Sequence, residues 1–413
     1  MADKNTSVLR PDTQVMTRGF DPSLSVGSAR PAVFRSSTYV FSSPEAAERA
    51  FDLMAGRAQP TADEQPDLVY SRFNHPNAEM LEDKLVPLET GGQAAIVFNS
   101  GMAAIMTALF TFVHPGESIV YTVPIYGGTQ HLIQDFLSTL DITGIPVPAG
   151  ASHEIDEAIR GAKNLAVVLI ETPANPTIIM TGIKQAATTA KGLAKKPVVM
   201  VDNTLMGPAF QHPLVLGADI CLYSATKYLS GFSDMIGGAA IAADPGLIRQ
   251  MRSKRSLFGN ILQPDECWML DGRLPTVALR MNRSSKNAER IAERLSRNSK
   301  VARVLYPTLF KDPEQIRIVN EQCDFPGGML SLDLKGGKKA AFEFLRNLRI
   351  ARNAVSLGSA ETLVCHPKTT THSGFTDAEF EQAGVTDGLV RISIGIEDWR
   401  DLLADFEQAL ELV

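Results

Sequence analysis

The feature that most constrains the fold is a series of short apolar runs separated by segments of helical character. Two of the separating segments, residues 102–113 and 129–140, have the length and apolar content expected of helices. Apolar strands that alternate with helices are typical of a mostly parallel sheet buried on both faces. The chain is therefore predicted to be an α/β protein whose parallel sheet contains residues 94–98, 118–122, 165–170, 198–201 and 220–223.

The length and the change of pattern along the chain predict more than one domain. At 413 residues the chain is too long for one ordinary core. Residues 1–75 show little periodicity and are assigned to an N-terminal arm, in which 56–66 is expected to form an exposed loop. Residues 76–270 carry the alternating pattern and form the large domain. Residues 271–413 mix long helices with strands at 328–334 and 389–394, which predicts a smaller α+β domain.

Composition excludes several classes of function. The 40 basic and 46 acidic residues leave a net charge of −6, so the electrostatics do not favour nucleic-acid binding. The four cysteines are scattered and the seven histidines show no metal spacing, which indicates a reducing compartment and no metal site. The N-terminal residues lack a signal-peptide core, and no apolar run approaches a membrane span. We expect a cytoplasmic protein with neither a membrane nor a nucleic acid as its partner.

Several polar residues directly follow the predicted strands. In open α/β sheets the ligand lies beyond the carboxyl ends of the strands. The residues at such positions are Ser100, Gly101, Glu171, Asp202 and the segment Ser224-Ala225-Thr226-Lys227. Their common placement predicts that they share one site.

The segment from Ser224 to Lys227 suits a pyridoxal 5'-phosphate site. The Lys227 amine can form an imine with the cofactor aldehyde, and the hydroxyls of Ser224 and Thr226 can bind its phosphate. Asp202, at the end of an apolar strand, can keep the ring nitrogen protonated. Burial would lower the pKa of Lys227 and favour this chemistry. The alternatives are a surface lysine and a carboxylate that only caps its strand.

Two further segments offer an anion site and an aromatic ring. Ser100-Gly101-Met102 lies between a strand and a helix, where backbone amides bind phosphate and glycine allows close approach. Such a turn is also common without a ligand. Tyr126 can stack on the cofactor ring and transfer protons, although a tyrosine in a turn can equally pack on the surface.

Two arginines offer positive charge to anions. Arg391 lies within an apolar, strand-like run, where a buried cation needs a partner. A substrate carboxylate would serve, and a structural salt bridge is the alternative. Arg72, with Tyr70 two residues before it, offers a cation and a hydroxyl to a phosphate from outside the large domain.

Taken together, these motifs make the chain resemble the transsulfuration family of fold-type I pyridoxal-phosphate enzymes over nearly its whole length. The family includes cystathionine γ-synthase, the cystathionine lyases, O-acetylhomoserine sulfhydrylase and methionine γ-lyase. The segments that carry the resemblance are Tyr70-Ser71-Arg72, Ser100-Gly101-Met102, Tyr126-Gly127-Gly128-Thr129, Glu171-Thr172-Pro173-Ala174-Asn175-Pro176-Thr177, Asp202-Asn203-Thr204, Ser224-Ala225-Thr226-Lys227, Ser356-Leu357-Gly358 and Arg391.

The resemblance implies roles for residues that the chemistry alone does not single out. Glu171 and Asn175 belong to the segment whose asparagine contacts the cofactor hydroxyl, and Thr204 lies in the motif of the ring-nitrogen aspartate. Ser356 is similar to a residue of the substrate-carboxylate pocket, together with Arg391. These residues complete the set expected to bind cofactor and substrate.

The resemblance also implies an assembly. Tyr70 and Arg72, in the N-terminal arm, are expected to cross a subunit boundary and grip the neighbour's cofactor phosphate. We therefore expect a homotetramer built as a dimer of dimers, because two-fold pairing lets each subunit complete its partner's site.

The reaction implied by the resemblance takes place at the γ-carbon of an amino acid. Lys227 is expected to remove the α-proton, and Tyr126 is the candidate acid toward the γ-substituent. Release of a 2-oxo acid and ammonia would make the enzyme a carbon–sulfur or carbon–oxygen γ-lyase, which we predict. Capture of an incoming nucleophile would make it a γ-replacement synthase of the cystathionine γ-synthase or O-acetylhomoserine sulfhydrylase type, which is the alternative.

Departures from the family pattern point to an altered substrate. Val355 is apolar where enzymes that handle cystathionine often carry a glutamate, which favours a methionine-like substrate. Gly128 stands where methionine γ-lyases usually have a cysteine, which argues against methionine itself. Further departures, expected near the pocket, are His75, Asn77, Phe232 and Lys368. An oxygen-linked substrate such as canavanine or O-acetylhomoserine is the resulting hypothesis, and the sequence does not determine the leaving group or the pathway.

Two interpretations from other classes remain open. A nucleotide-binding α/β protein would place Lys227 on a phosphate, but neither a P-loop nor a G-x-G-x-x-G segment occurs. A catalytically silent binding protein with the same fold is the other alternative. The presence of Lys227, Asp202, Tyr126 and Arg391 argues against it.

Overall fold

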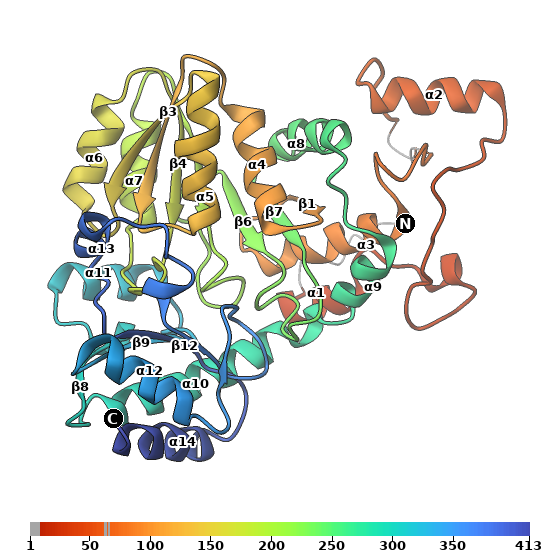
Figure 1. The fold of residues 1–413 in the computed structure, drawn as a ribbon. Coiled ribbons are helices and arrows are strands. Elements are labelled where there is room, and N and C mark those ends of the chain that lie inside the picture. The colour runs from red at the N-terminus through yellow and green to blue at the C-terminus, as the bar shows by residue number, and fades with distance from the viewer. Residues whose placement is uncertain (1–8, 62–63, 65–66) are drawn as a thin grey trace.

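The computed structural model describes residues 9–61, 64 and 67–413. It contains two sheets, and helix α10 (Val277–Leu295) runs from the larger sheet toward the smaller one (Figure 1). This arrangement confirms the predicted α/β class with a smaller α+β part. The predicted domain boundaries after residues 75 and 270 stay predictions. The expected loop at 56–66 falls partly on residues outside the described ranges.

The large sheet has seven strands in the order β1-β7-β6-β5-β4-β2-β3. Only β7 runs against its neighbours, since it pairs antiparallel with both β1 and β6. All the predicted strands are confirmed, whereas β3 and β7 were missed. The strands are β1 (Ala94–Phe98), β2 (Ser118–Val123), β3 (Thr143–Pro148), β4 (Leu165–Glu171), β5 (Val198–Asp202), β6 (Ile220–Ser224) and β7 (Gly238–Ala242).

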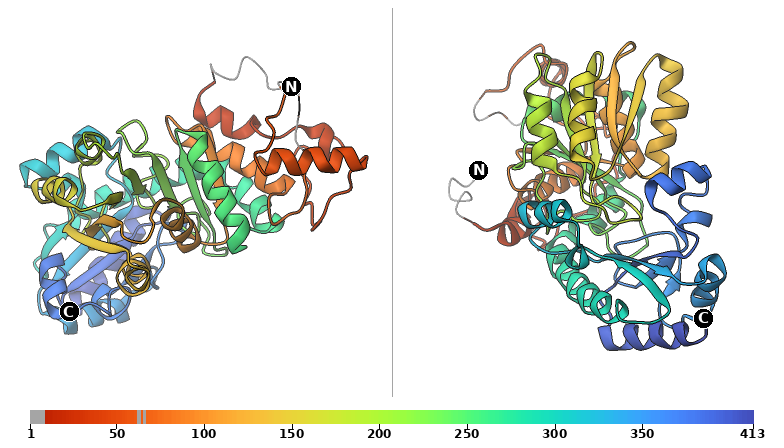
Figure 2. Two further views of the ribbon diagram at one scale, coloured as in Figure 1. Left: turned by 90° about the horizontal axis from the view of Figure 1, so that it is seen from above. Right: turned by 90° about the vertical axis from the view of Figure 1, so that its left-hand side faces the viewer.

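Helices cover both faces of the large sheet (Figure 2). On one face α4 and α8 pack over β1, β6 and β7, with Leu109 and Met251 in their shared core. On the other face α6 and α7 bury Ile155 and Ile183 against the strands. The sheet is thus buried on both sides, as its apolar strands predicted. The helices are α4 (Gly101–Phe112), α6 (Ser152–Gly161), α7 (Ile183–Lys191) and α8 (Pro245–Phe258).

The helix predicted at 129–140 is confirmed in extent but changes type along its length. It begins as α5 (Gly127–His131), continues as a π-helix over Leu132–Phe136, and ends as a 3-10 helix over Leu137–Leu140. Short π segments interrupt α-helices most often next to functional sites. This one begins five residues after the start of α5, whose first residue follows Tyr126.

The smaller sheet has five strands in the order β10-β11-β12-β9-β8. Helices α10, α12 and α14 cover it and share a core with Leu330, Ile392 and Phe406. The predicted strands at 328–334 and 389–394 are confirmed as β9 and β12. The elements are β8 (Val301–Leu305), β9 (Met329–Leu334), β10 (Arg352–Asn353), β11 (Leu363–Cys365), β12 (Leu389–Ser393), α11 (Pro313–Gln322), α12 (Gly337–Asn347), α13 (Asp377–Ala383) and α14 (Trp399–Glu411).

The N-terminal arm is more helical than its sequence predicted. Helix α2 begins after Ser43, whose hydroxyl accepts a hydrogen bond from the Ala46 amide, and it stands away from both sheets (Figure 1). Its apolar residues Phe51 and Met54 are exposed. The arm is followed by α3, which packs on α9 near the edge strand β1. The helices are α1 (Pro11–Thr17), α2 (Pro44–Met54), α3 (Pro76–Leu85) and α9 (Pro264–Asp271).

Candidate active site

Lys227 lies in the turn that follows β6, at the carboxyl edge of the large sheet. Its amine donates a hydrogen bond to Ser356 Oγ at 3.2 Å, which joins the large domain to the segment after β10. Burial lowers the pKa of Lys227, and the charge of Arg391 lowers it further, against the opposing effect of Asp202. The alternative of a surface lysine is therefore wrong.

A cavity of about 270 Å³ contains this lysine. Every large-domain residue predicted to bind the cofactor lines it, together with four apolar residues, of which only Leu357 belongs to a segment singled out in the sequence. Apolar wall residues such as Ile236 carry no chemical signal that could have identified them. The lining residues are Ser100, Gly101, Met102, Ile105, Tyr126, Glu171, Asn175, Asp202, Thr204, Leu205, Ser224, Thr226, Lys227, Ile236 and Leu357.

One end of the cavity is built to receive an anion. Ser100 caps the 12-residue helix α4 by accepting from the Ala103 amide, and Gly101 and Met102 of the first turn line the cavity, where the free amides of a helix N-terminus suit an anion. Gly101 is required there, because a Cβ at this position would lie 2.9 Å from the Ser224 Cβ. Thr226 is held by the main chain of Gly237, with which its hydroxyl exchanges hydrogen bonds of 3.0 and 3.2 Å. This end therefore fits a phosphate group.

Two buried carboxyl groups lie deeper in the cavity. Asp202, at the end of β5, accepts a hydrogen bond from the Thr204 amide at 3.0 Å, and burial raises its pKa. Glu171, at the end of β4, accepts from the amides of Tyr126 at 2.8 Å and Asn175 at 3.2 Å. Burial, reinforced by the charge of Asp202, raises the pKa of Glu171 to about 8. A protonated pyridine nitrogen beside Asp202 would stabilise the negative charge of this carboxylate against the effect of burial.

Arg391 lies on β12 and is buried beside the cavity. Its guanidinium donates to Asn175 Oδ1 at 3.1 Å and to the carbonyls of Val355 and Ser356 at 2.7 and 3.0 Å. Within the described part of the chain, no carboxylate lies within 4.0 Å of it, and its Nε has no hydrogen-bond partner. The alternative of a structural salt bridge is therefore not realised. A substrate carboxylate would supply the missing partner.

Tyr70 and Arg72 do not line the cavity of their own chain. Arg72 donates to the Ser256 carbonyl at 2.6 Å, and its guanidinium lies 4.9 Å from the ring centre of Phe73. Tyr70 is 42% exposed. Their predicted contact with a neighbouring subunit's cofactor stays a prediction.

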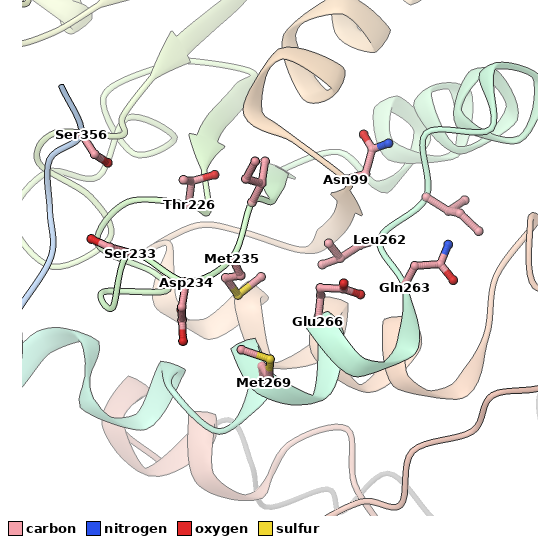
Figure 3. A pocket seen from close by; sticks show the side chains of 12 residues that line it. Asn99, Thr226, Ser233, Asp234, Met235, Leu262, Gln263, Glu266, Met269 and Ser356 are labelled. Atoms are coloured by element: carbon pink, nitrogen blue, oxygen red, sulfur yellow. The ribbon is translucent and has the colours of Figure 1, made fainter. Parts of the chain in front are cut away.

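A second cavity, of about 640 Å³, adjoins the first (Figure 3). The two share Thr226 and Ile236, and Ser356 lines the second one. Its far wall is formed by Leu262, Glu266 and other residues of α9 and the segment before it (Figure 3). This space was not predicted from the sequence, because its walls are brought together from separate parts of the chain.

Three departures from the family pattern do not lie at the pocket, contrary to the prediction. His75 caps α3 and its Nε2 lies 2.9 Å from the Leu262 carbonyl, while Asn77 contacts the main chain of Phe34. Lys368 forms an ion pair with Asp387 at 2.7 Å. Each side chain is therefore occupied by local structure.

Gly128 and Phe232, the other departures, lie closer to the chemistry. A Cβ on Gly128 would lie 2.7 Å from the Tyr126 ring and 3.0 Å from Met102 Sδ. Phe232 is half exposed and lies against the guanidinium groups of Arg273 and Arg280. Among these departures, only Gly128 thus touches residues that line the first cavity, whereas His75 contacts Leu262 of the second.

No group of histidine, cysteine or acidic side chains in the described ranges is placed to hold a metal ion. Nor does any helix there combine the length and apolar character needed to cross a membrane.

The chain is similar in sequence to several known proteins over most of its length. The chain is 36% identical to the L-methionine γ-lyase of Fusobacterium nucleatum subsp. polymorphum over 389 residues, which cover 94% of each chain. It is 35% identical to the L-methionine γ-lyase of Pseudomonas putida over 400 residues, which cover 97% of this chain and 96% of the other. It is 38% identical to the cystathionine γ-lyase of Bacillus subtilis over 353 residues, 86% of this chain and 91% of the other.

Solved structures of other proteins are also similar to this chain. The metB protein of Corynebacterium glutamicum is 32% identical with a TM-score of 0.87, and 98% of each chain is covered. The cystathionine γ-lyase of Lactobacillus plantarum, solved with L-serine, is 30% identical with a TM-score of 0.87 and coverage of 98% of this chain and 99% of the other. The predicted fold-type I architecture is confirmed.

A family model described as "Cys/Met metabolism PLP-dependent enzyme" matches residues 12–411. This match confirms the predicted cofactor, pyridoxal 5'-phosphate, and excludes the nucleotide-binding alternative. The chain therefore belongs to the family of pyridoxal-phosphate-dependent enzymes of cysteine and methionine metabolism.

Proposed function

We propose that this enzyme catalyses γ-elimination on a γ-substituted L-amino acid, releasing the γ-substituent with a 2-oxo acid and ammonia. The observation that carries the proposal is the pairing of two groups around Ser356. Its hydroxyl accepts from the Lys227 amine, while its carbonyl accepts from Arg391. Lys227, a candidate base, and Arg391, a candidate anion-binding group, therefore both contact Ser356. A substrate that binds through its α-carboxylate needs these two groups close together, so that its α-proton lies near the base.

The residues of the cavity divide between the parts of the cofactor. The amides of Gly101 and Met102 and the hydroxyls of Ser100, Ser224 and Thr226 would hold the phosphate. Asp202 would hold the ring nitrogen, with Thr204 orienting its carboxylate, and Asn175 would contact the ring hydroxyl. The Tyr126 ring would stack on the cofactor ring, and Glu171 would support that turn through the Tyr126 amide. When bound, pyridoxal phosphate supplies an electron sink for charge that develops on the α-carbon.

The chain's own groups would then move the protons. The depressed pKa of Lys227 favours the neutral amine, which can take the α-proton. Arg391 would bind the carboxylate with two parallel N–H groups once it releases the carbonyls of Val355 and Ser356. Tyr126, 48% exposed at the mouth of the cavity, would donate a proton to the departing γ-substituent.

The exposed apolar residues near the site favour a γ-substituent without a distal cation. Val355 is 57% exposed beside Ser356, and Ile236 is 65% exposed where the two cavities meet. Neither can balance an ammonium group. The names of the methionine γ-lyase relatives support a methionine-like substrate, and the oxygen-linked substrates remain the second class to test.

We propose the assembly together with the reaction. Tyr70 and Arg72 of residues 1–75 would enter the second cavity of another copy and reach the phosphate beyond Thr226. The size of that cavity and the exposed apolar residues of α2 support a homotetramer built as a dimer of dimers. The proposed location is the cytoplasm.

Turnover of single substrates tests the proposed reaction. Methionine, homocysteine, cystathionine, canavanine and O-acetylhomoserine are each supplied with and without an added thiol, and 2-oxo acid release is followed. Release without thiol is the expected result, with Lys227→Ala as the inactive control. If no substrate reacts until thiol is added, and a new thioether then forms, the enzyme is a γ-replacement synthase instead.

A further inference from the structure

Helix α10 carries polar side chains on its buried face. Arg280, Ser284 and Asn287 are separated by four and three positions, so they lie along one side of the helix. All three are buried. Apolar residues are expected at such positions, and polar ones are retained only where they find partners.

Arg280 binds the main chain just after Lys227. Its guanidinium donates to the carbonyl of Tyr228 at 2.7 Å and to that of Leu229 at 3.2 Å. Gly231 permits this approach, since a Cβ there would collide with the guanidinium. Phe232 lies over the same guanidinium, with its ring centre 5.5 Å away. The turn that carries Lys227 is therefore tied to α10 by a two-pronged contact.

Ser284 and Asn287 bind the main chain just after β12. The Ser284 hydroxyl donates to the Ile394 carbonyl at 2.5 Å. The Asn287 amide donates to the carbonyls of Gly395 and Glu397 at 3.1 and 2.8 Å. Ile394 lies three residues after Arg391 on the same strand path. The strand that carries Arg391 is therefore tied to the same helix face.

We propose that Arg280, Ser284 and Asn287 are positioning residues that set the spacing between the Lys227 amine and the Arg391 guanidinium. A continuous helix rises by a constant 1.5 Å per residue, so it holds its two attachment points at a constant separation. Lys227 and Arg391 come from different sheets and need such a common support. This inference rests on the proposed function, because it takes these two residues as the ends of the substrate site.

The test uses the cofactor-loaded enzyme and two variants, one at each attachment point. Arg280→Lys keeps the charge but cannot reach both carbonyls in the geometry of a guanidinium. Asn287→Ala removes the contact at the β12 end. Arg294→Lys, on the exposed side of the same helix, is the matched control.

Two readouts do not depend on γ-elimination. The first is the pH midpoint of the visible absorption of the loaded enzyme, which reports on Lys227. The second is the dissociation constant for glycine, which has a carboxylate for Arg391 but no γ-carbon. Failure to turn over any γ-substituted amino acid would refute the proposed function and leave both readouts usable.

We expect Arg280→Lys to shift the absorption midpoint by about one pH unit, since the turn that carries the amine is displaced. Both site variants should weaken glycine binding by about tenfold, because displacements of about 1 Å are costly in oriented sites. The control should change neither readout. Variants that melt at lower temperature but keep both values would show a purely structural role and overturn the proposal. If Arg280→Lys fails to fold, the test relies on Asn287→Ala, and an unchanged dissociation constant for glycine in that variant overturns the proposal.

Discussion

Glu171 and Asp202 face each other in register at the ends of β4 and β5, and both are buried. Two adjacent carboxylates in such a place repel each other, so one of them stays protonated. Burial and the charge of Asp202 raise the pKa of Glu171, and the proposed contact of Asp202 with a protonated ring nitrogen favours Asp202 as the ionised partner. The division of roles between the two acids follows from this pairing.

This relationship predicts unequal effects of neutral replacements. Asp202→Asn removes the negative charge proposed for the ring nitrogen, so kcat should fall by at least about 100-fold. Glu171→Gln resembles the protonated acid and loses one amide contact, so kcat should fall by only about tenfold. Steady-state kinetics with the best substrate measures both. Equal losses in the two variants would contradict the assigned roles.

Gly128 is predicted to set the position of the Tyr126 ring. A Cβ in Gly128→Ala would overlap that ring at 2.7 Å, so the ring must move from its present position. We expect kcat/KM to fall by about tenfold with little change in melting temperature. Gly161→Ala is the matched control, since a Cβ there meets open space. An unaffected Gly128→Ala enzyme would show that the ring position is unimportant.

Val355 is predicted to select against cationic γ-substituents. Val355→Glu places a carboxylate at an exposed position next to Ser356, which lines the second cavity, and an ammonium group on the substrate could pair with it there. The ratio of kcat/KM for cystathionine over methionine should rise by about tenfold or more. Val215→Glu, at a position of similar exposure in the segment between β5 and β6, should leave the ratio unchanged.

If each active site uses residues of two subunits, two inactive variants should restore activity when they assemble together. Arg72→Ala and Lys227→Ala should each be inactive or nearly so when alone, because each lacks a part of every site. Dissociated and reassembled together, they should recover about a quarter of the wild-type activity, since half of random dimers are mixed and each restores one site of two. No recovery from a mixture shown to contain mixed dimers would place Arg72 in its own subunit's site.

The free energy of unfolding should decrease as pH rises, because the Glu89 carboxyl is buried. Burial raises the pKa of this carboxyl to about 8, and Tyr223 donates to it at 2.7 Å. A group with a raised folded pKa stabilises fully below its unfolded pKa, and this contribution is lost as pH rises through the folded value. Between about pH 4.5 and 8, the free energy of unfolding of Glu89→Gln should therefore decrease less steeply with rising pH than that of the wild type. The difference in slope should reach up to about 1.4 kcal/mol per pH unit.

Denaturant unfolding of this variant at several pH values gives the slope. Glu407→Gln, at an exposed position, is the control. His212, 4.0 Å from Glu89 and with its pKa lowered by burial, is retained in both variants. An unchanged slope in Glu89→Gln would show that the carboxyl is already ionised in the folded protein.

Local pattern was sufficient for most of the large sheet and failed where small residues stand in place of branched apolar ones. The apolar runs of β4 and β5 are unmistakable because every residue in β4 is buried. Strand β7 was missed because Gly238 and the alanines beside it carry little strand propensity. Their small size is needed in the folded protein, since a Cβ on Gly238 would overlap the Ser100 carbonyl.

The amino-acid sequence by itself determined the fold class, the cofactor and the large-domain residues proposed to bind that cofactor. Residue type and position after a strand indicated some of these residues, and the resemblance of short motifs to one family indicated the others, such as Asn175 and Thr204. All of these signals are local in the sequence. Only the tertiary structure decided that Arg391 meets no carboxylate among the described residues, that Glu171 and Asp202 are neighbours in register, and that His75 serves as a helix cap. Charge state and partnership depend on distances between segments far apart in the chain, and no local pattern encodes those distances.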